Sequence, residues 1–600
     1  MTALRCGRAA LAAFVLATSV TAAAAEDLNK TLHVAFPIAE TGFDPQAAGD
    51  AYSNYVNRVI FDPLYIYDYV ARPFKIVPNT AAALPEISAD GKTWTIRVKP
   101  GIYFADDPVF KGRKRELVAA DYVFSWKRLL DPRMRAISNQ VFDGRLVGAE
   151  AVVAAAMASG KFDYGAPIEG LQAIDRYTIR IKLNYPAYAL LSDLTTAATG
   201  AVAREVIEAY GDASGWAMAN PVGTGPYRLK EWRRGQKIVL EANPGYRHVV
   251  FPASSDPADG AIMASMRGKK LPQIERIEIA IIEETNPRLL AFRREELDFL
   301  AVLPDLIWSV LTTDGKLKPE FARRGVQLAH GLQPSITYTY FNMDDPVVGG
   351  YTKDKIALRR AISMAYNTEE EIRVIRQGQA EPATQPIPPN VTGYNPKLNG
   401  HVQFDPAGAK ALLDKFGYVD RDGDGWRDLP DGKPLTLTIA SPPSGTDRQF
   451  DELWKKSMDA VGVRIEFFKQ KWPDLLKMAR AGQLQMWSLG NISNTTEPFA
   501  FLDLLYGPHS GVTNLARFNL PEFNQLYERA RQLPDSSERT RLFEQMSQLV
   551  TAYAPWKLDA YRYETVLIYP WVLGYKYNPF DPFPWQYLGL DEARRAAAGQ

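Results

Sequence analysis

The sequence predicts a multidomain α/β protein, and three observations support this prediction. The chain has 600 residues, which is too long for one hydrophobic core, so several domains are expected. Segments with the alternating pattern of a strand and segments with the apolar face of a helix follow one another along the chain. Apolar residues make up 46% and charged residues 23%, which is typical of a soluble globular protein rather than a disordered or membrane-embedded one.

Residues 1–25 have the features of a secretory signal peptide. Arg5 and Arg8 precede an apolar stretch over residues 9–20, and a run of alanines at its end offers a cleavage site. The single cysteine, Cys6, lies in this leader, so the mature chain would have no disulfide, no thiolate and no lipid-bearing cysteine. We expect a free periplasmic protein; an uncleaved anchor is the alternative, which the short, alanine-rich stretch disfavours.

The charge balance gives no reason to expect a polyanionic partner. The formal net charge is +1, and loss of the two leader arginines would make it −1 (1 − 2 = −1). So small a net charge creates no strong field for nucleic acid or anionic lipid. We therefore expect no nucleic acid partner.

The first part of the mature chain predicts a strand, a loop and a helix in that order. Residues 31–36 alternate as a strand does, and E-T-G-F-D-P at 40–45 predicts a loop through its glycine and its Asp-Pro pair. Residues 52–60 predict a helix that leads into F-D-P-L at 61–64.

Residues 84–130 predict a hairpin followed by a helix. Trp94, Ile96 and Val98 alternate with polar residues, as in a half-buried strand, and Asp121 is the expected N-cap of the helix. The basic stretch 111–115 would suit an anion, but such charge runs are more often a solvated loop tip.

The stretch P-V-G-T-G-P-Y-R-L at 221–229 predicts a rigid turn that leads into a hairpin. Two glycines and two prolines within six residues exclude regular helix or central strand, because glycine permits positive φ or close backbone approach and proline fixes φ. Residues 227–240 then have the composition of strands around a turn at Arg234-Gly235.

The second half of the chain continues the alternation of strands and helices. Residues 338–343 and 484–489 predict strands, and residues 354–366 predict a helix that Asn367 ends. We expect a capping box of Thr368 and Glu371 in the helix that follows. Asp405-Pro406 predicts the start of another helix through its N-cap and N1 residues.

An acidic segment at 420–431 has two interpretations. Asp420, Asp422 and Asp424 occupy alternate positions and Asp431 the twelfth, which partly matches a calcium-binding loop. The usual twelfth ligand is glutamate, and a hairpin turn explains the same residues.

No motif for catalysis or metal binding is present. The five histidines are scattered, without H-E-x-x-H or a pair at metal-ligand spacing. There is no G-x-S-x-G, no P-loop and no Rossmann fingerprint. We therefore expect no enzyme activity, no metal and no cofactor.

The order of these blocks resembles that of one protein family. P-V-G-T-G-P-Y at 221–227, the strand–loop–helix–F-D-P-L order at 31–64 and L-R-R-A-I-S-M-A-Y-N at 358–367 are similar to the family 5 extracellular solute-binding proteins of bacterial ABC importers. The resemblance implies a two-lobed periplasmic-binding-protein fold, α/β, of class II, with an extra subdomain and a hinge of crossover strands. It implies domains in this order: signal peptide 1–25, core of the first lobe 26–64, 216–305 and 561–600, extra subdomain 65–215, and second lobe 306–560.

The resemblance also implies a ligand site between the lobes. The loop 490–498 resembles a loop of peptide receptors that ends in D-x-x-E-P, whose aspartate pairs with the amino terminus of the peptide, and Asn494 stands at that position. A neutral amide cannot form this charge-assisted pair, so Glu40 or Asp44 takes its place, the alignment of the loop is shifted by one residue, or the ligand has no free amine. We expect these ligand-binding residues: Glu40, Phe43, Tyr340, Asn342, Tyr394, Trp487, Asn491 and Asn494.

The expected function is that of a receptor that captures a peptide or peptide-like solute and delivers it to an inner-membrane ABC permease. We expect a monomer. The alternatives are the same receptor class with a sugar-like, aromatic or metal-complex ligand, and an enzyme or chaperone on this scaffold.

Overall fold

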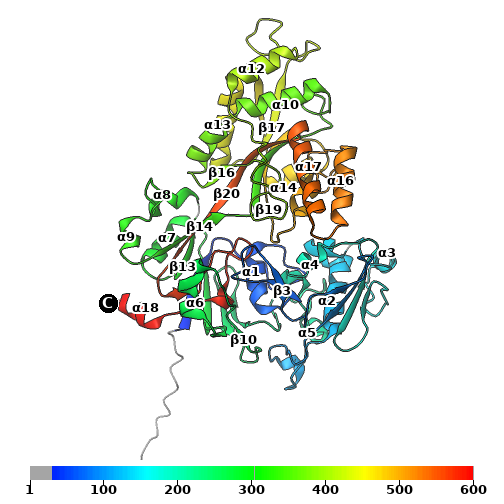
Figure 1. Cartoon of the computed structure of the whole chain (residues 1–600), viewed down its shortest axis with the longest axis vertical. Helices are drawn as coiled ribbons and strands as arrows, with labels where there is room; N and C mark the ends of the chain where they lie inside the picture. Colours follow the sequence, from blue (N-terminus) through cyan, green and yellow to red (C-terminus); the bar gives the residue numbers. More distant parts are fainter. Residues whose placement is uncertain (1–29, 143, 303, 599–600) are drawn as a thin grey trace, which may run out of the picture.

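The computed structural model describes residues 30–598 except 143 and 303, so the predicted signal peptide lies outside the described residues. Two lobes are stacked along the long axis (Figure 1). The lower lobe contains the chain from β1 (Thr31–Phe36) to β14 (Gln327–Leu332) together with α18 (Glu592–Ala598), and the upper lobe contains the chain from β15 (Ser335–Phe341) to α17 (Ser537–Tyr553). Within the described ranges, none of the helices combines the length and the apolar character needed to cross a bilayer.

The core of the first lobe is built on a four-stranded sheet in the order β1-β12-β9-β8. β1 runs parallel to β12, and the other neighbours are antiparallel. The elements of this lobe are β1 (Thr31–Phe36), α1 (Ala51–Ile60), β8 (Tyr227–Arg233), β9 (Lys237–Ala242), β10 (Val249–Val250), α6 (Gly260–Met266), β11 (Lys270–Leu271), β12 (Arg276–Ile281), α7 (Thr285–Arg293), β13 (Phe299–Val302), α8 (Ile307–Val310), α9 (Pro319–Ala322), β14 (Gln327–Leu332), β21 (Val572–Leu573), β22 (Gly589–Leu590) and α18 (Glu592–Ala598).

The predicted turn before β8 is a contact between two backbones. A Cβ at Gly223 would lie 2.0 Å from the carbonyl oxygen of Ile60, and a Cβ at Gly225 would lie 2.5 Å from that of Val59. Neither glycine has a positive φ, so close approach to the end of α1 is what requires them. The Gly225 N–H donates to the Ile60 carbonyl at 2.9 Å, which fixes the turn on the helix.

The extra subdomain has its own sheet, in the order β4-β5-β7-β6, and its own hydrophobic core, whose side chains run from Leu64 to Val222. Trp94, Ile96 and Val98 are buried in that core, as the alternation predicted. The elements are β2 (Tyr65–Tyr67), β3 (Ile76–Pro78), β4 (Glu86–Ile87), β5 (Thr93–Arg97), α2 (Ala119–Leu130), α3 (Ala149–Ser159), β6 (Leu171–Ala173), β7 (Thr178–Lys182), α4 (Leu190–Asp193) and α5 (Arg204–Tyr210).

A fully buried ion pair joins the subdomain to the rest of the first lobe. The two Nη atoms of Arg128 on α2 donate to the two carboxylate oxygens of Asp44, at 3.0 and 2.6 Å, and neither side chain is exposed. Asp44 also accepts the N–H of Ala217 at 2.8 Å, and Arg128 donates to the carbonyl of Gly215 at 2.8 Å. The predicted loop at 40–45 is therefore a structural joint.

An eight-stranded sheet, whose main order is β13-β20-β15-β19-β17-β18, extends from the first lobe into the second. β17 is parallel to β18 and β19, and β15 is antiparallel to β19 and β20. The elements are β15 (Ser335–Phe341), α10 (Lys353–Ala365), α11 (Thr368–Glu370), the π-helical turn η8 (Glu371–Ile375), β16 (Ala380–Pro382), α12 (Pro406–Lys415), β17 (Thr436–Ser441), α13 (Gly445–Asp459), β18 (Arg464–Lys469), α14 (Trp472–Arg480), β19 (Met486–Ile492), α15 (Phe499–Leu502), α16 (Pro521–Arg531), α17 (Ser537–Tyr553) and β20 (Trp556–Ile568).

Two connections link the lobes. β20 has 13 residues; its first part pairs with β15 and β16 in the second lobe, and its last part pairs with β13 and β14 in the first. β14 continues through residues 333–334 into β15, which is the second connection. The hinge of crossover strands expected from the family resemblance is therefore formed by β14–β15 and β20.

The packing moves one expected domain boundary. Leu306, Ile307, Val310, Phe321 and Val326 belong to the hydrophobic cluster of the first lobe, together with side chains of β1 and β12. We therefore propose that the second lobe begins near residue 333 rather than at 306. The helix–strand alternation of residues 306–332 does not indicate whether this segment packs in the core of the first lobe or of the second.

Two predicted caps are wrong in detail. Val118, not Asp121, is the N-cap of α2; Asp121 is the third helical residue and accepts the Val118 N–H at 2.9 Å. Asn367, not Thr368, caps α11 and accepts the Glu370 N–H at 2.9 Å. Asp405 caps α12 as predicted.

We predict that Arg128→Met lowers the free energy of unfolding by about 3–5 kcal/mol, because it leaves the Asp44 carboxylate buried without a counter-charge. Urea denaturation followed by tryptophan fluorescence measures the change. The matched control is Lys316→Met, whose partner Asp314 is exposed, and it should leave the free energy of unfolding nearly unchanged. Equal costs for the two variants would contradict the structural role of the buried pair.

Candidate functional site

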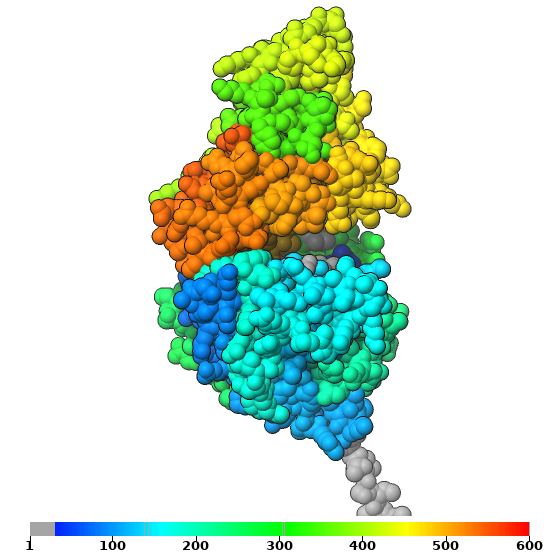
Figure 2. Space-filling model, turned by 90° about the vertical axis from the view of Figure 1, so that its right-hand side faces the viewer, coloured from blue at the N-terminus to red at the C-terminus, as the bar shows by residue number. Residues whose placement is uncertain are grey.

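A crevice separates the two lobes, as Figure 2 shows from the side. At its inner end lies a pocket of about 70 Å³, the interlobe pocket, to which both lobes contribute. Most of its wall comes from the first lobe, and Asn494 comes from the second. The lining residues are Arg58, Pro63, Ile66, Tyr67, Tyr69, Thr195, Ala197, Asn494, Asn578, Phe580, Asp581, Gln586 and Tyr587.

The lobes touch at the interlobe pocket. The Tyr67 hydroxyl accepts the N–H of Thr496 at 3.0 Å and lies 3.2 Å from the Thr496 hydroxyl. Tyr67 also stacks on Phe580, with the ring centroids 5.6 Å apart. Tyr67 therefore joins the subdomain to the loop that follows β19.

A larger pocket, of about 370 Å³, lies in the second lobe at the carboxyl end of β17 and beside the first part of β19; we call it the sheet-edge pocket. Ligands of open α/β sheets commonly bind outside the carboxyl ends of the strands. Five aromatic side chains form much of the wall, and Trp472 is 52% exposed there. The aromatic residues are Tyr366, Phe450, Trp454, Trp472 and Trp487.

Polar and charged groups line the rest of the sheet-edge pocket. Arg376 pairs with Glu371 at 2.6 Å and donates to the Thr337 hydroxyl at 3.1 Å. Burial acts to raise the pKa of Glu371, but Arg376 and Lys557 outweigh it and hold that pKa below its usual value. Lys557 in turn pairs with Asp559. These charges are neutralised within the protein.

One segment connects the two pockets. Trp487 to Gly490 line the sheet-edge pocket, and Asn494, four residues later, lines the interlobe pocket. Between them, Asn491 donates to the carbonyl of Ala500 at 2.7 Å, and Ile492 is 48% exposed. The loop at 490–498 therefore lies in the crevice between the lobes.

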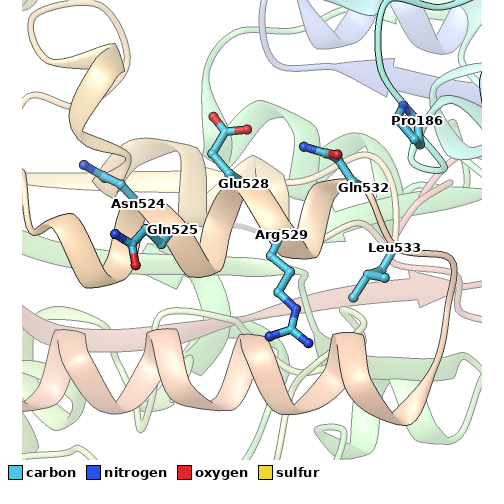
Figure 3. Close-up of a pocket in the computed structure, with 7 residues that line it drawn as sticks. All are labelled: Pro186, Asn524, Gln525, Glu528, Arg529, Gln532 and Leu533. Carbon is cyan, nitrogen blue, oxygen red and sulfur yellow. The ribbon is translucent and has the colours of Figure 1, made fainter.

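A third pocket lies at the rim of the crevice, between Pro186 of the subdomain and α16 (Figure 3). It is a wide depression of about 630 Å³, lined by Asn524, Gln525, Glu528, Arg529, Gln532 and Leu533 in addition to Pro186. Nearby, the guanidinium of Arg531 lies 4.2 Å from the ring centre of Tyr185. The lobes therefore also touch at the rim.

The hinge strand contributes two charged side chains that the sequence analysis did not single out. Arg562 and Glu564 lie on β20, where the strand leaves β16 and joins β14, and both are partly buried. Burial and the neighbouring Arg376 lower the pKa of Arg562 to about 10. Burial raises the pKa of Glu564 to about 7, in spite of a hydrogen bond from Tyr577.

Of the expected site residues, Asn494 lines the interlobe pocket and Trp487 lines the sheet-edge pocket, while Asn491 lies on the segment between them. Their role in binding stays a prediction. The other expected site residues lie elsewhere.

Glu40 and Phe43 are corrected to structural residues of the first lobe. The Glu40 carboxylate accepts the N–H groups of Trp232 and Gly235, and Phe43 is fully buried against Trp232. The Asp44 carboxylate is committed to Arg128, and the Glu40 side chain is buried in the first lobe.

Tyr340, Asn342 and Tyr394 also lie outside the crevice lining. Tyr340 is 1% exposed in a hydrophobic cluster that also contains Trp487, its partner across β15 and β19. Asn342 is buried and donates to the carbonyls of Gly482 and Leu484, both at 3.0 Å. Tyr394 packs against the same cluster as Tyr340. Tyr340 lies on β15, Asn342 directly follows that strand and Tyr394 lies in a loop, and the sequence alone did not show that all three pack inside the second lobe.

The acidic segment favours the turn interpretation. Asp420 accepts the N–H groups of Gly423 and Gly425, at 2.8 and 3.0 Å. The oxygens that come within 4.8 Å of one another belong to Asp420, Asp422 and Asp428, whereas Asp431 pairs with Lys433. The predicted twelfth ligand is therefore wrong.

The sequence contains one signal for Arg562 and Glu564, which the prediction from sequence did not include. In the β-forming run Y-R-Y-E-T-V-L-I at 561–568, two charges stand two positions apart, so one face of the strand leaves the apolar core there. Tyr67 and Trp472 gave no comparable signal.

Comparisons with known proteins agree on one family. The family model described as bacterial extracellular solute-binding proteins, family 5, middle part, matches residues 75–511. The di/tripeptide-binding protein 2 of Pseudomonas aeruginosa is 26% identical, over 95% of this chain and 96% of its own length. Heme-binding protein A of Haemophilus influenzae is 26% identical, over 82% and 81%.

Solved structures show the same fold. NikA of Brucella suis in complex with Fe(III)-EDTA has a TM-score of 0.72 and 19% identity, covering 94% of this chain and all of that one. DppA of Helicobacter pylori in complex with the peptide STSA has a TM-score of 0.68 and 21% identity, covering 93% and 98%.

We predict that Glu564→Gln stabilises the protein at pH 8 relative to wild type by about 1 to 3 kcal/mol, and much less at pH 4.5. The pKa of Glu564 is raised from 4.5 to about 7, so its contribution to stability is full at low pH and is lost as the pH rises through 7. Urea denaturation at the two pH values measures the difference. Glu208→Gln, on the exposed surface of α5, is the control; an equal gain in both variants would contradict the assignment.

Proposed function

The chain belongs to the bacterial extracellular solute-binding proteins of family 5, and on this premise we propose that it captures a peptide or peptide-like solute in the interlobe crevice. It is a solute-binding receptor of the kind that serves ABC importers, and its relatives are named as binding proteins rather than enzymes. In this proposal the solute-loaded form delivers its cargo to the inner-membrane permease of such an importer.

The observation that carries the proposal is a crevice in which both lobes reach the same small pocket. Asn494 of the second lobe lines it together with side chains of the first, and Tyr67 bonds to Thr496 across it. A solute held there contacts both lobes at once, so its binding energy favours the closed arrangement. Closure changes the surface that the receptor presents, which is how a permease would recognise the loaded form.

The peptide class rests on the relatives and on the placement of the loop. The di/tripeptide-binding protein 2 aligns over 95% of the chain, and the loop at 490–498 lies in the crevice. The fold alone does not select a ligand, because proteins of similar fold were solved with a peptide and with Fe(III)-EDTA.

A second candidate is a non-peptide solute, such as a sugar-like, aromatic or metal-complex ligand. It is favoured by the amide at Asn494 and by the aromatic wall of the sheet-edge pocket. Sugars and aromatic groups pack well on such a wall and need no counter-charge. We further propose a periplasmic monomer without nucleic acid partners; the leader at residues 1–25 would direct the export.

We predict that the purified protein binds one ligand per chain and is stabilised by it. A ligand present at 100 times its Kd adds about 2.7 kcal/mol to the free energy of unfolding. A thermal-shift screen of peptides, sugars and metal complexes, together with mass spectrometry of any co-purifying solute, identifies the class. X-ray scattering with and without that ligand tests closure; identical curves with a saturating ligand would contradict the two-lobe mechanism.

We predict that Asn494→Asp raises the affinity for peptides with a free amino terminus about tenfold, because a carboxylate in the interlobe pocket adds a charge-assisted hydrogen bond. Isothermal titration calorimetry with a peptide found in the screen measures the change. The N-acetylated peptide and the exposed-site variant Asn399→Asp are the controls. An unchanged affinity would show that the ligand amine does not reach Asn494.

A further inference from the structure

Three amide side chains of the interlobe pocket have hydrogen-bonding groups to spare. Asn494, Asn578 and Gln586 all line it, the first from the second lobe and the other two from the C-terminal part of the first lobe. Within the described ranges, the side chains of Asn494 and Gln586 make no hydrogen bond. Asn578 is 3% exposed; its Oδ1 accepts the Phe580 N–H at 3.0 Å, and its Nδ2 has no partner among the same residues. The pocket therefore presents amide donors and acceptors that a ligand can complete.

Three hydroxyl groups of this pocket are already bonded. The Tyr67 hydroxyl accepts the Thr496 N–H at 3.0 Å. The hydroxyls of Tyr69 and Thr195 donate to backbone carbonyls at 2.9 and 2.7 Å. Most of the remaining wall is apolar, and it is formed by Pro63, Ile66, Ala197, Phe580 and the ring of Tyr587. A group held in the pocket therefore meets apolar surface and free amides.

The charges at the interlobe pocket are compensated. Arg58 and Asp581 are the two charged residues that line it, and they pair with each other at 3.6 Å. The acid of the loop at 490–498 is Glu497, which pairs with Arg539 at 2.6 Å. A ligand ammonium would find no uncompensated carboxylate on this lining, and burying it there would cost free energy that a neutral amide does not lose. The pocket therefore suits an uncharged group.

A smaller cavity, of about 40 Å³, adjoins the interlobe pocket inside the first lobe. The two share the lining residues Arg58, Pro63, Ile66, Gln586 and Tyr587. Farther in, the wall includes the apolar side chains of Val249 and Leu271. The other charged residue of this lining, Asp62, pairs with Arg247 at 2.6 Å. A small apolar group that enters the interlobe pocket thus has room to extend inward without meeting an unpaired charge.

We propose that the interlobe pocket binds an uncharged acylamide end of the solute, so that the receptor selects peptides whose amino terminus is N-acylated or closed into a lactam. The Nδ2 of Asn578 donates to the acyl oxygen, and Asn494 and Gln586 bond the rest of the amide from the two lobes. This proposal rests on the solute-receptor function and names the chemical form of its ligand. It also gives the neutral side chain of Asn494 a task of its own.

The test uses the mature full-length protein and a library of tripeptides in three forms that share a free carboxyl terminus: free amine, N-acetylated and N,N-dimethylated. The dimethyl form has nearly the size of the acetyl form but keeps the positive charge. The forms compete in one pool, and peptides retained after rapid gel filtration are quantified by mass spectrometry. We expect the wild type to retain the N-acetylated forms about 10- to 100-fold better than either charged form, the range for leaving a buried group unsatisfied.

Variants of the pocket assign the preference to its amides. Gln586→Met removes the hydrogen-bonding groups with little change in shape, and should reduce the preference about three- to tenfold. Because the Gln586 side chain has no partner in the described part of the chain, the ligand-free melting temperature should not change. Asn494→Asp should shift the preference about tenfold toward the free-amine forms. The matched control is Gln548→Met, an exposed amide on α17, which should retain peptides as the wild type does.

The outcomes separate this proposal from the receptor function. If the wild type retains free-amine peptides as well as the N-acetylated ones or better, the acylamide proposal is overturned and the receptor function stands. Equal retention of the dimethylated and acetylated forms would show selection by size and would also overturn it. Full preference in both Gln586→Met and Asn494→Asp would exclude the interlobe pocket as its source. If no peptide of any form is retained, the peptide proposal fails, and the acylamide proposal fails with it.

Discussion

The two-lobed arrangement depends on the backbone hydrogen bonds of β20, because this one strand pairs with strands of both lobes. Its first part completes the sheet beside β15, and its last part completes the pairing with β13 and β14. Each half is held by the core of its own lobe, and Val566, Leu567 and Ile568 are fully or almost fully buried in the first. The residues between these two parts carry the strand from one lobe to the other.

The fold could be predicted from the sequence because its signals are local and independent of the partner. Gly223 and Gly225 are required by backbone contact with α1, and the caps and alternating strands obey rules that act within a few residues. The order of these blocks adds the family, and with it the two-lobed arrangement. The start of the second lobe was harder to predict, because the sequence pattern of residues 306–332 would be the same in the core of either lobe.

The site was only partly predictable, for a physical reason. A loop such as 490–498 has to lie at the surface, and once its position in the sheet order is known it falls in the crevice. Tyr340 lies on β15, where the choice between core and crevice depends on which face of the sheet the neighbouring helices cover. Glu40 and Phe43 stand in a polar-looking loop, but the burial of Arg128 beneath it gives the loop a structural task.

The buried joint between Asp44 and Arg128 has a mechanical consequence. It ties the subdomain to the first lobe, as the glycine contact with α1 does, so these parts turn together as one stiff arm about the crossing strands. Tyr185 of the subdomain meets Arg531 of the second lobe, whose guanidinium lies 4.2 Å from the centre of its ring. If the lobes separate about the crossing strands, this contact has to break, so its strength is one of the terms that set how long the receptor remains closed.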